Sequence, residues 1–297
     1  MSTGTPASQR RQILAWLHPW VLAGHTVTYL IGLGAARYLG TALNAPAAWL
    51  GWLWTLSLQA GMFLLEGAWA DAQRASPPPP PERVRLERRA VLAGFALLAL
   101  TASLTVMLAR ASGAGLNAWV LMAISFALLG WYALPPWQGA RRGYGEILLA
   151  VVGSNLVPAL AFALQTGTVH RLLAMVTFAL PLLYIASRLA LELETYAQDL
   201  KYLHHTLLLR LGWEQGIRVH NGLVGAALLV MGAALGMGLA PRLGLPPLLS
   251  LSWGGFQIWY LGRIREGMAP DWRVLRLSAA LLYALPACLT AFTLWSG

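Results

Sequence analysis

Long apolar runs, separated by short polar segments, follow one another through almost the whole chain. A bilayer core of about 30 Å requires about 20 apolar residues per helix. Nine runs reach or approach that length and predict about nine transmembrane helices: 16–39, 47–69, 90–110, 118–134, 147–165, 172–193, 222–239, 248–261 and 275–295. Charged residues make up 11% of the chain, against roughly 25% in a soluble domain. We therefore expect an all-α integral membrane protein that lipid covers on most of its outside.

The basic residues predict which side of the membrane each loop faces. Arg and Lys concentrate in alternate loops, and only Arg37, Arg110, Arg171 and Arg242 fall in the others. Because basic loops stay inside, this distribution predicts a cytoplasmic N-terminus, an outside C-terminus and insertion in the cytoplasmic (inner) membrane. The net charge of +10 is then explained by loops that face anionic lipid, and we expect no nucleic-acid partner.

The pattern predicts a single polytopic membrane domain over residues 1–297. It would have a cytoplasmic N-terminal tail over 1–15 and a proline-rich cytoplasmic loop over 70–89, in which Pro77–Pro81 form an unbroken run. The loops on the predicted cytoplasmic side are the longer ones, and function tends to sit on long loops over a rigid scaffold. The single cysteine, Cys288, excludes an intramolecular disulfide.

Several single residues within or near the apolar runs are expected to have structural roles. His25 and Asn155 are predicted to form hydrogen bonds between helices. His220 lies near the end of a run and is expected to be wetted. Gly232 and Gly236 form a pair of small residues four apart, which would let a neighbouring helix approach closely.

Polar clusters at the predicted cytoplasmic ends of three runs are the candidates for chemistry. They lie at residues 66–74, 132–146 and 192–212. Polar and ionisable residues at membrane depth are costly, so a functional role is their default interpretation.

A series of short motifs connects the second and third clusters to a known family. The motif residues are His18-Pro19-Trp20, Tyr132, Pro135-Pro136, Arg142-Gly143, Gly145-Glu146, Gln165-Thr166-Gly167, Thr206-Leu207 and Leu211-Gly212. In order and spacing, over roughly 17–236, they resemble the UbiA superfamily of intramembrane prenyltransferases, and within it the branch that prenylates 1,4-dihydroxy-2-naphthoate on the way to menaquinone. The resemblance implies nine helices around a central cavity that opens toward the cytoplasm and sideways into lipid. It also implies transfer of a polyprenyl group from its diphosphate to an aromatic acceptor, in quinone or related lipid biosynthesis.

The resemblance further implies Mg²⁺ as the cofactor, held by five aspartates in two motifs, and here the chain departs from the family. Gly67, Ala70 and Arg74 occupy the three aspartate positions of the first motif, and Thr195 occupies the first position of the second. Only Asp199 matches. Since Mg²⁺ is bound by carboxylates together with phosphate oxygens, other acids must replace the missing four, or the metal site is absent.

A catalytic interpretation takes the replacement acids from nearby positions. Glu66, Glu192 and Asp199 would hold one Mg²⁺ and form the catalytic set. The residues expected to bind substrate are Arg74, Lys201, His204, Glu146 and Tyr132. Two alternatives remain for Arg74: it replaces a metal charge and binds a phosphate bidentately, or it is an interfacial residue whose side chain snorkels to water.

A non-catalytic interpretation keeps the apolar cavity, has lost the metal site and needs no cofactor. The chain would bind a quinone or another isoprenoid lipid, or serve as a membrane subunit of a larger complex. A transporter is a third alternative, disfavoured because the sequence shows neither an inverted repeat nor a carboxylate at mid-bilayer depth. The expected partners are the lipid bilayer, a polyprenyl diphosphate or isoprenoid lipid, an aromatic acceptor and other membrane proteins.

Overall fold

A computed structural model describes the fold of residues 6–74, 81–111, 114–202 and 206–297, and the side chains of residues 10–69, 81–111, 114–201 and 206–297. Every regular element in these ranges is helical. The elements are α1 (Pro6–Leu17), α2 (Pro19–Tyr38), α3 (Ala45–Arg74), α4 (Pro81–Ala111), α5 (Leu116–Ala133), a 3-10 turn (Gly139–Arg142), α6 (Gly145–Val151), a π-helical segment (Val152–Leu156), α7 (Val157–Thr166), α8 (Arg171–Thr177), α9 (Leu180–Tyr202), α10 (Leu207–Leu211), α11 (Trp213–Gly236), α12 (Pro241–Ser250), α13 (Ser252–Arg265) and α14 (Trp272–Ser296).

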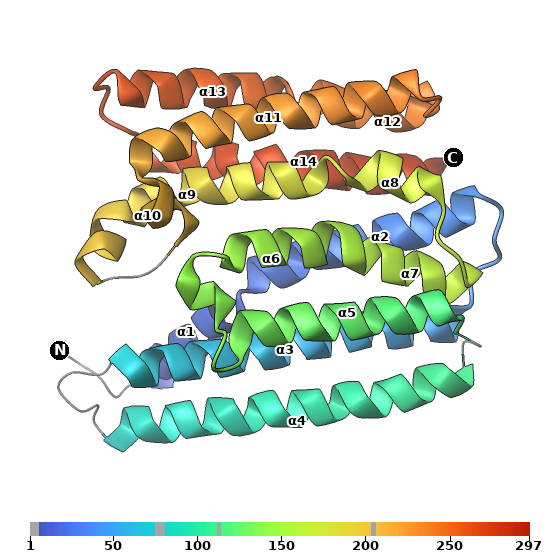
Figure 1. The fold of residues 1–297 in the computed structure, drawn as a ribbon, viewed down its shortest axis with the longest axis horizontal. Coiled ribbons are helices and arrows are strands. Elements are labelled where there is room, and N and C mark those ends of the chain that lie inside the picture. The colour runs from blue at the N-terminus through green and yellow to red at the C-terminus, as the bar shows by residue number, and fades with distance from the viewer. Residues whose placement is uncertain (1–5, 75–80, 112–113, 203–205) are drawn as a thin grey trace.

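The long helices lie side by side in one bundle, and α1 and the end of α14 lie at its opposite ends (Figure 1). Within the described residues, seven helical segments are long and apolar enough to cross a membrane, by length and composition. Helix α4 packs against α3 at one edge, whereas α2 packs against both α7 and α14 in the interior. The core contains large side chains with almost no exposed surface, among them Tyr29, Phe63 and Phe162.

All nine predicted apolar runs lie in helices, which confirms the all-α membrane fold. Several runs differ in detail, among them 172–193, which is divided between α8 and α9, and 147–165, which contains the π-helical segment. The first helix of the bundle begins at Pro19 and not at residue 16, because His18 adopts the left-handed conformation and Pro19 starts a new helix. The eighth run is broken at Leu251, between α12 and α13. Pro246 and Pro247 lie just before this break, and neither can donate a backbone hydrogen bond.

Two segments expected to be loops are largely helical. The predicted N-terminal tail forms α1 from Pro6 onward. In the predicted loop 70–89, α3 continues to Arg74 and α4 begins at Pro81. The connection is therefore shorter than predicted, and most of the proline run lies at 75–80, outside the described residues.

Polar contacts within the bundle confirm one structural prediction and correct two. His25 Nδ1 lies 2.5 Å from Gln59 Oε1 on α3, so His25 does link two helices. Asn155, in the π-helical segment, has no hydrogen-bond partner for its Oδ1 among the described residues. His220 was expected to be wetted, but only 1% of its surface is exposed. His220 belongs to α11, and its side chain is buried within the bundle. Its Nδ1 lies 2.9 Å from Asn221 Oδ1.

The closest approach between helices involves a glycine outside the predicted pair. A β-carbon built on Gly232 or Gly236 would meet no heavy atom within 4 Å in the described part of the chain outside its own helix, and both residues are exposed. On Gly32, by contrast, the added carbon would overlap the backbone carbonyl of Pro158 on α7. The small residue that lets two helices meet is therefore Gly32 on α2.

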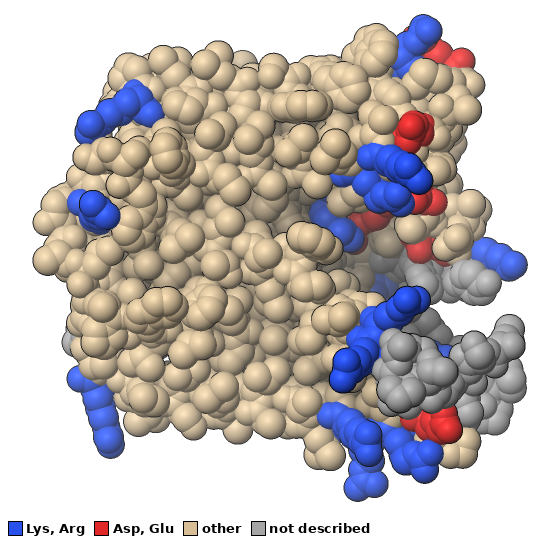
Figure 2. Space-filling view, turned by 180° about the vertical axis from the view of Figure 1, so that it is seen from behind, with Lys and Arg blue, Asp and Glu red and all other residues tan. Residues whose placement is uncertain are grey.

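Charge is distributed unequally between the two ends of the bundle. On the face drawn in Figure 2, Asp and Glu atoms lie at one end only, whereas Lys and Arg atoms lie at both. The end with both signs of charge is hollowed, and charged atoms are visible inside the hollow. The end of α9, α10 and the turn before α6 all lie at this end of the bundle (Figure 1). The polar clusters found in the sequence therefore come together at this end.

Candidate functional site

Glu192 occupies the centre of the site, on the inward side of α9. Its side chain is 4% exposed. Its Oε2 accepts a hydrogen bond of 3.2 Å from the backbone N–H of Leu208, the second residue of α10. Its Oε1 lies 3.8 Å from Nη2 of Arg188, one turn earlier on α9. A buried carboxylate requires such partners because desolvation is otherwise costly.

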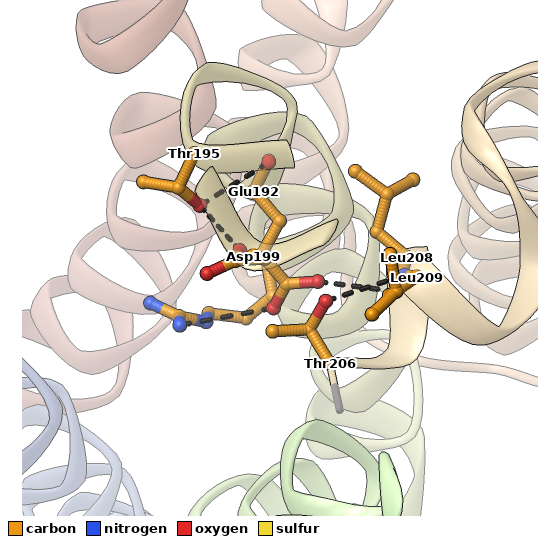
Figure 3. A network of polar contacts seen from close by, with 7 residues as sticks. Glu192, Thr195, Asp199, Thr206, Leu208 and Leu209 are labelled. Atoms are coloured by element: carbon orange, nitrogen blue, oxygen red, sulfur yellow. Dashed lines mark hydrogen bonds and ion pairs between the residues drawn. The ribbon is translucent and has the colours of Figure 1, made fainter. Parts of the chain in front are cut away.

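The short helix α10 is held in place by two residues of the family motifs. Thr206 caps its N-terminus and accepts a hydrogen bond of 3.2 Å from Leu209 N–H. Gly212 ends the helix with φ of 78°, a conformation that glycine adopts without a steric penalty. Figure 3 shows Thr206 and Leu208 facing Glu192 across the space between α10 and α9. The Thr-Leu and Leu-Gly motifs therefore position a backbone donor for Glu192.

A second carboxyl group reaches Glu192 from the start of α6. The turn before α6 requires glycine at Gly143, where φ is 73°. Arg210 stabilises this turn by donating a hydrogen bond of 2.8 Å to the Arg142 carbonyl. Glu146 then lies in the first turn of α6, within hydrogen-bonding reach of the Glu192 carboxyl group. The Arg-Gly-x-Gly-Glu motif thus brings Glu146 to a residue 46 positions later in the chain.

Three buried oxygen atoms around this pair lack a hydrogen-bond donor among the described residues. They are Glu146 Oε2, Glu192 Oε1 and the Tyr184 hydroxyl. When both carboxyl groups are ionised, their oxygens are all acceptors and cannot satisfy each other. Tyr184 lies on α9 within electrostatic range of both glutamates. Arg188 is within electrostatic range of all three, and 39% of its side chain is exposed. Part of this basic side chain is therefore accessible beside the three oxygens.

Aromatic rings form the wall beside these polar groups. Tyr132, at the end of α5, is 5% exposed and lies within electrostatic range of Glu66, Glu146 and Arg188. Its ring packs edge-on against Phe63, with centroids 5.7 Å apart, and Phe63 packs against His18 at 5.3 Å. The prediction that Tyr132 and Glu146 lie near one site is consistent with this arrangement.

The three residues predicted to hold Mg²⁺ do not lie together in one group. Asp199 lies two turns beyond Glu192 on α9 and accepts a hydrogen bond of 2.7 Å from Thr195 (Figure 3). Glu66 is half-buried near the end of α3, on the side of Tyr132. Among the described side chains, no three His, Cys, Asp or Glu residues gather closely enough to hold a metal ion.

The donor set therefore does not fit the paired-metal arrangement that the family resemblance implies. Glu192 faces the guanidinium of Arg188 and the carboxyl group of Glu146, and the positive charge of Arg188 disfavours a divalent cation next to Glu192. The side chains of Arg74 and His204 lie outside the described part of the chain. Lys201 is exposed at the end of α9.

The sequence did not indicate Arg188 and Tyr184 as site residues. Both lie inside an apolar run, where Arg188 is explained equally well as a basic residue near the predicted inside end of that run. A signal was present, because Arg188, Glu192 and Tyr184 are four residues apart and so share one face of a helix. What the sequence could not show is that Glu146 lies opposite this face.

Replacing Thr206 by alanine tests the role assigned to α10. The variant loses the capping oxygen, and we expect a loss of about 0.5–2 kcal/mol in the free energy of unfolding. The change is measured as a lower midpoint of thermal unfolding in detergent. Thr206→Ser keeps the oxygen and is expected to remain close to the wild type. Equal destabilisation by both variants would show that the methyl group, and not the cap, matters.

Comparison with known proteins supports the fold over nearly the full length. No family model and no curated protein sequence matches the chain. Among solved structures, a digeranylgeranylglyceryl phosphate synthase is similar with a TM-score of 0.64 and 13% identity, over 98% of both chains. A UbiA homologue from Archaeoglobus fulgidus bound to Cd²⁺ is similar with a TM-score of 0.60 and 17% identity, over 94% of this chain and 99% of that one.

A further structure of a UbiA homologue from Archaeoglobus fulgidus, bound to GPP and Mg²⁺, has a TM-score of 0.56 and 18% identity over 96% of this chain and 100% of its own. These identities are low, so the likeness concerns the arrangement of the helices and not the chemistry of the site. Over nearly its entire length, the chain therefore has the fold of the UbiA superfamily of membrane prenyltransferases.

Proposed function

We propose that this chain is a UbiA-type membrane protein whose central site binds the hydroxylated aromatic head group of a quinol or phenol of isoprenoid metabolism. One observation carries the proposal: the buried oxygens of Glu146, Glu192 and Tyr184 lack donors and lie around the partly exposed side chain of Arg188. A ligand that satisfies them must both donate and accept hydrogen bonds. The hydroxyl groups of a quinol do both.

The surroundings of the site favour an aromatic ring attached to an apolar tail. Tyr132 lies beside the polar groups, and the buried ring of Phe63 supports it through an edge contact and also contacts His18; aromatic pairs of this geometry are stabilising. Ligand hydroxyls would donate to Glu146 and Glu192, while Arg188 would donate to a ligand oxygen. An isoprenoid tail would then extend into the apolar bundle or the lipid. Because the sequence resembles the naphthoate branch of the family, a naphthoquinol is the first ligand to test.

The test compares naphthoquinol with naphthoquinone, which lacks the hydroxyl donors. Binding is measured anaerobically by isothermal titration of the full chain in lipid nanodiscs. We expect the quinol to bind at least about tenfold more tightly, since a hydrogen bond to a charged group contributes about 1.5–3 kcal/mol. Equal affinity for the two redox forms would contradict the proposal, because it would show that the carboxyl groups do not recognise the hydroxyls.

Removal of divalent metal is expected to leave quinol affinity unchanged. The contacts proposed here come from Glu146, Arg188 and Glu192, and no metal ion takes part in them. Titration with naphthoquinol is repeated after dialysis against EDTA and again after adding Mg²⁺. A loss of affinity on chelation that Mg²⁺ restores would show instead that a cation bridges the carboxyl pair to the ligand.

Prenyl transfer is a second candidate function, and the paired carboxyl groups of Glu146 and Glu192 favour it. In this reaction the allylic C–O bond breaks, pyrophosphate leaves, and a bond forms between the allylic carbon and the acceptor ring. The proton released by the acceptor would pass to one of the two carboxylates, which are the bases nearest to it. The diphosphate would then be bound by two groups of residues. Glu66 and Asp199 would act through Mg²⁺, and Arg74, Lys201 and His204 would contact the phosphates directly.

The two candidates are separated by a turnover assay with a prenyl diphosphate, an aromatic acceptor and Mg²⁺. Transfer that requires Asp199 would vanish in Asp199→Ala, whereas binding of naphthoquinol would remain. Turnover by the Asp199→Ala variant would remove Asp199 from the catalytic set. Quinol binding without turnover in the wild type, with every combination of diphosphate and acceptor, supports the non-catalytic form of the proposal.

A further inference from the structure

At the end of the bundle opposite the Glu146–Glu192 site, the charged side chains are all arginines. Every acidic residue lies in the segments 66–87, 146, 192–214 and 266–271, which border the other end. Arg37, Arg110, Arg171 and Arg242 lie in the connections at the opposite end. No Asp or Glu side chain pairs with Arg37 or Arg242 within the part of the chain that the structure describes, although Gly297, the last residue, lies beside Arg242.

An apolar hollow opens beside two of these arginines. It has a volume of about 400 Å³ and lies between α2, the start of α3 and the end of α14. Its walls include Leu30, Leu33, Ala48, Trp49, Trp52 and Trp295. Trp49 is 65% exposed and Leu30 is 40% exposed, so the hollow faces the lipid.

The polar atoms in the walls of this hollow are already paired. The Trp52 indole N–H donates to the Thr26 hydroxyl at 3.2 Å, and the Trp295 indole N–H donates to the Leu30 carbonyl at 3.0 Å. The Tyr29 hydroxyl donates to the Ala48 carbonyl at 2.8 Å. Since none of these groups is left to bind a polar ligand, the hollow suits a hydrocarbon chain.

Aromatic rings hold both arginines at this end of the bundle, and one of these rings is a wall of the hollow. The guanidinium of Arg37 lies over the ring of Trp295, 5.3 Å from its centroid, and Trp295 is itself a wall of the hollow. Arg242 lies over the ring of Tyr38 at 5.0 Å and donates a hydrogen bond of 3.1 Å to its hydroxyl. Both guanidinium groups keep further N–H donors for an anion.

The length of α2 beside the hollow matches the thickness of one lipid leaflet. From Thr26 to Arg37, α2 rises by about 16 Å at about 1.5 Å per residue, which is close to half of a bilayer core of about 30 Å. We propose that this hollow binds one acyl chain of an anionic phospholipid in the adjacent leaflet, and that Arg37 and Arg242 hold its phosphate. The site is separate from the quinol site and does not depend on the proposed function.

The test measures retained lipid by native mass spectrometry of the full chain released from nanodiscs that contain phosphatidylglycerol and phosphatidylcholine in equal amounts. We expect the wild type to retain phosphatidylglycerol preferentially. In the double variant Arg37→Gln and Arg242→Gln, retention is expected to fall about tenfold to thirtyfold. The matched control is Arg110→Gln with Arg171→Gln, which removes two arginines of the same end but away from the hollow.

A second variant tests the apolar half of the site without changing charge. Ala48→Phe fills the hollow from α3 and is expected to reduce retention of phosphatidylglycerol while both arginines remain. Equal loss in the control pair would overturn the proposal, because it would show a diffuse charge effect. Equal retention of phosphatidylcholine would overturn it too. So would displacement of the phospholipid by a prenyl diphosphate, which would make the hollow part of a substrate path.

Discussion

Replacing Gly32 by alanine is expected to destabilise the bundle by about 1–3 kcal/mol, the range typical of overpacked cores. The new β-carbon would overlap the carbonyl oxygen of Pro158 and lie 2.9 Å from its carbonyl carbon and 2.7 Å from the β-carbon of Ala161. These atoms belong to the backbone and first side-chain carbon of α7, so no rotamer change can move them away. Helices α2 and α7 would have to separate.

The matched control is Gly232→Ala on α11. Its β-carbon would meet nothing within 4 Å beyond its own helix in the described chain, and alanine favours helix by about 1 kcal/mol over glycine. The two glycine-to-alanine changes are therefore expected to shift the midpoint of thermal unfolding in opposite directions. An unchanged midpoint for Gly32→Ala would show that α2 and α7 are less tightly packed than the structure indicates.

Replacing Glu192 by glutamine is expected to weaken naphthoquinol binding about tenfold to a hundredfold, through loss of one hydrogen bond to a charged acceptor. Glutamine has nearly the same volume, and its carbonyl can still accept from the Leu208 N–H. We therefore expect the unfolding midpoint not to fall, which separates an effect on binding from an effect on folding. Affinity is measured by isothermal titration in nanodiscs.

Glu194→Gln is the control for this change. Glu194 lies two residues further along α9, where it pairs with Arg276 at 2.6 Å outside the site. Its replacement removes the same charge from the same helix and is expected to leave quinol affinity unchanged. If both variants bind equally well, or lose affinity equally, the assignment of Glu192 to the ligand is wrong.

The membrane fold could be predicted because its cause is local. Each apolar run had to become a helix, since only a helix satisfies its own backbone hydrogen bonds in lipid. The limits of that reasoning appear where local rules compete with packing. The run at 248–261 is split at Leu251, and the predicted loop 70–89 is largely helical. A helix need not begin or end where its apolar stretch does.

The candidate site could be predicted only in part. The structure places Tyr132 and Glu192 within range of Glu146, whereas the sequence assigned Glu192 to the metal set and the other two residues to the substrate. Glu66, Glu192 and Asp199 were chosen as acids near the motif positions that the resemblance implies, and the structure does not gather these three into a metal-binding group. Spacing along one helix predicts which residues share a face, but it contains no information about which residue of another helix lies opposite.

The sequence by itself determined that this protein folds in lipid, that it is helical, and which residues stand at the positions where the resemblance implies aspartates. These properties depend on residue type and on distances along the chain. Only the tertiary structure decided that Glu192 faces Arg188 and Glu146, and that Gly32, not Gly232, lies where two helices touch. The physical reason is the same in both cases. Contacts between helices depend on how each helix is rotated about its axis, and this rotation is set by the packing of the whole bundle.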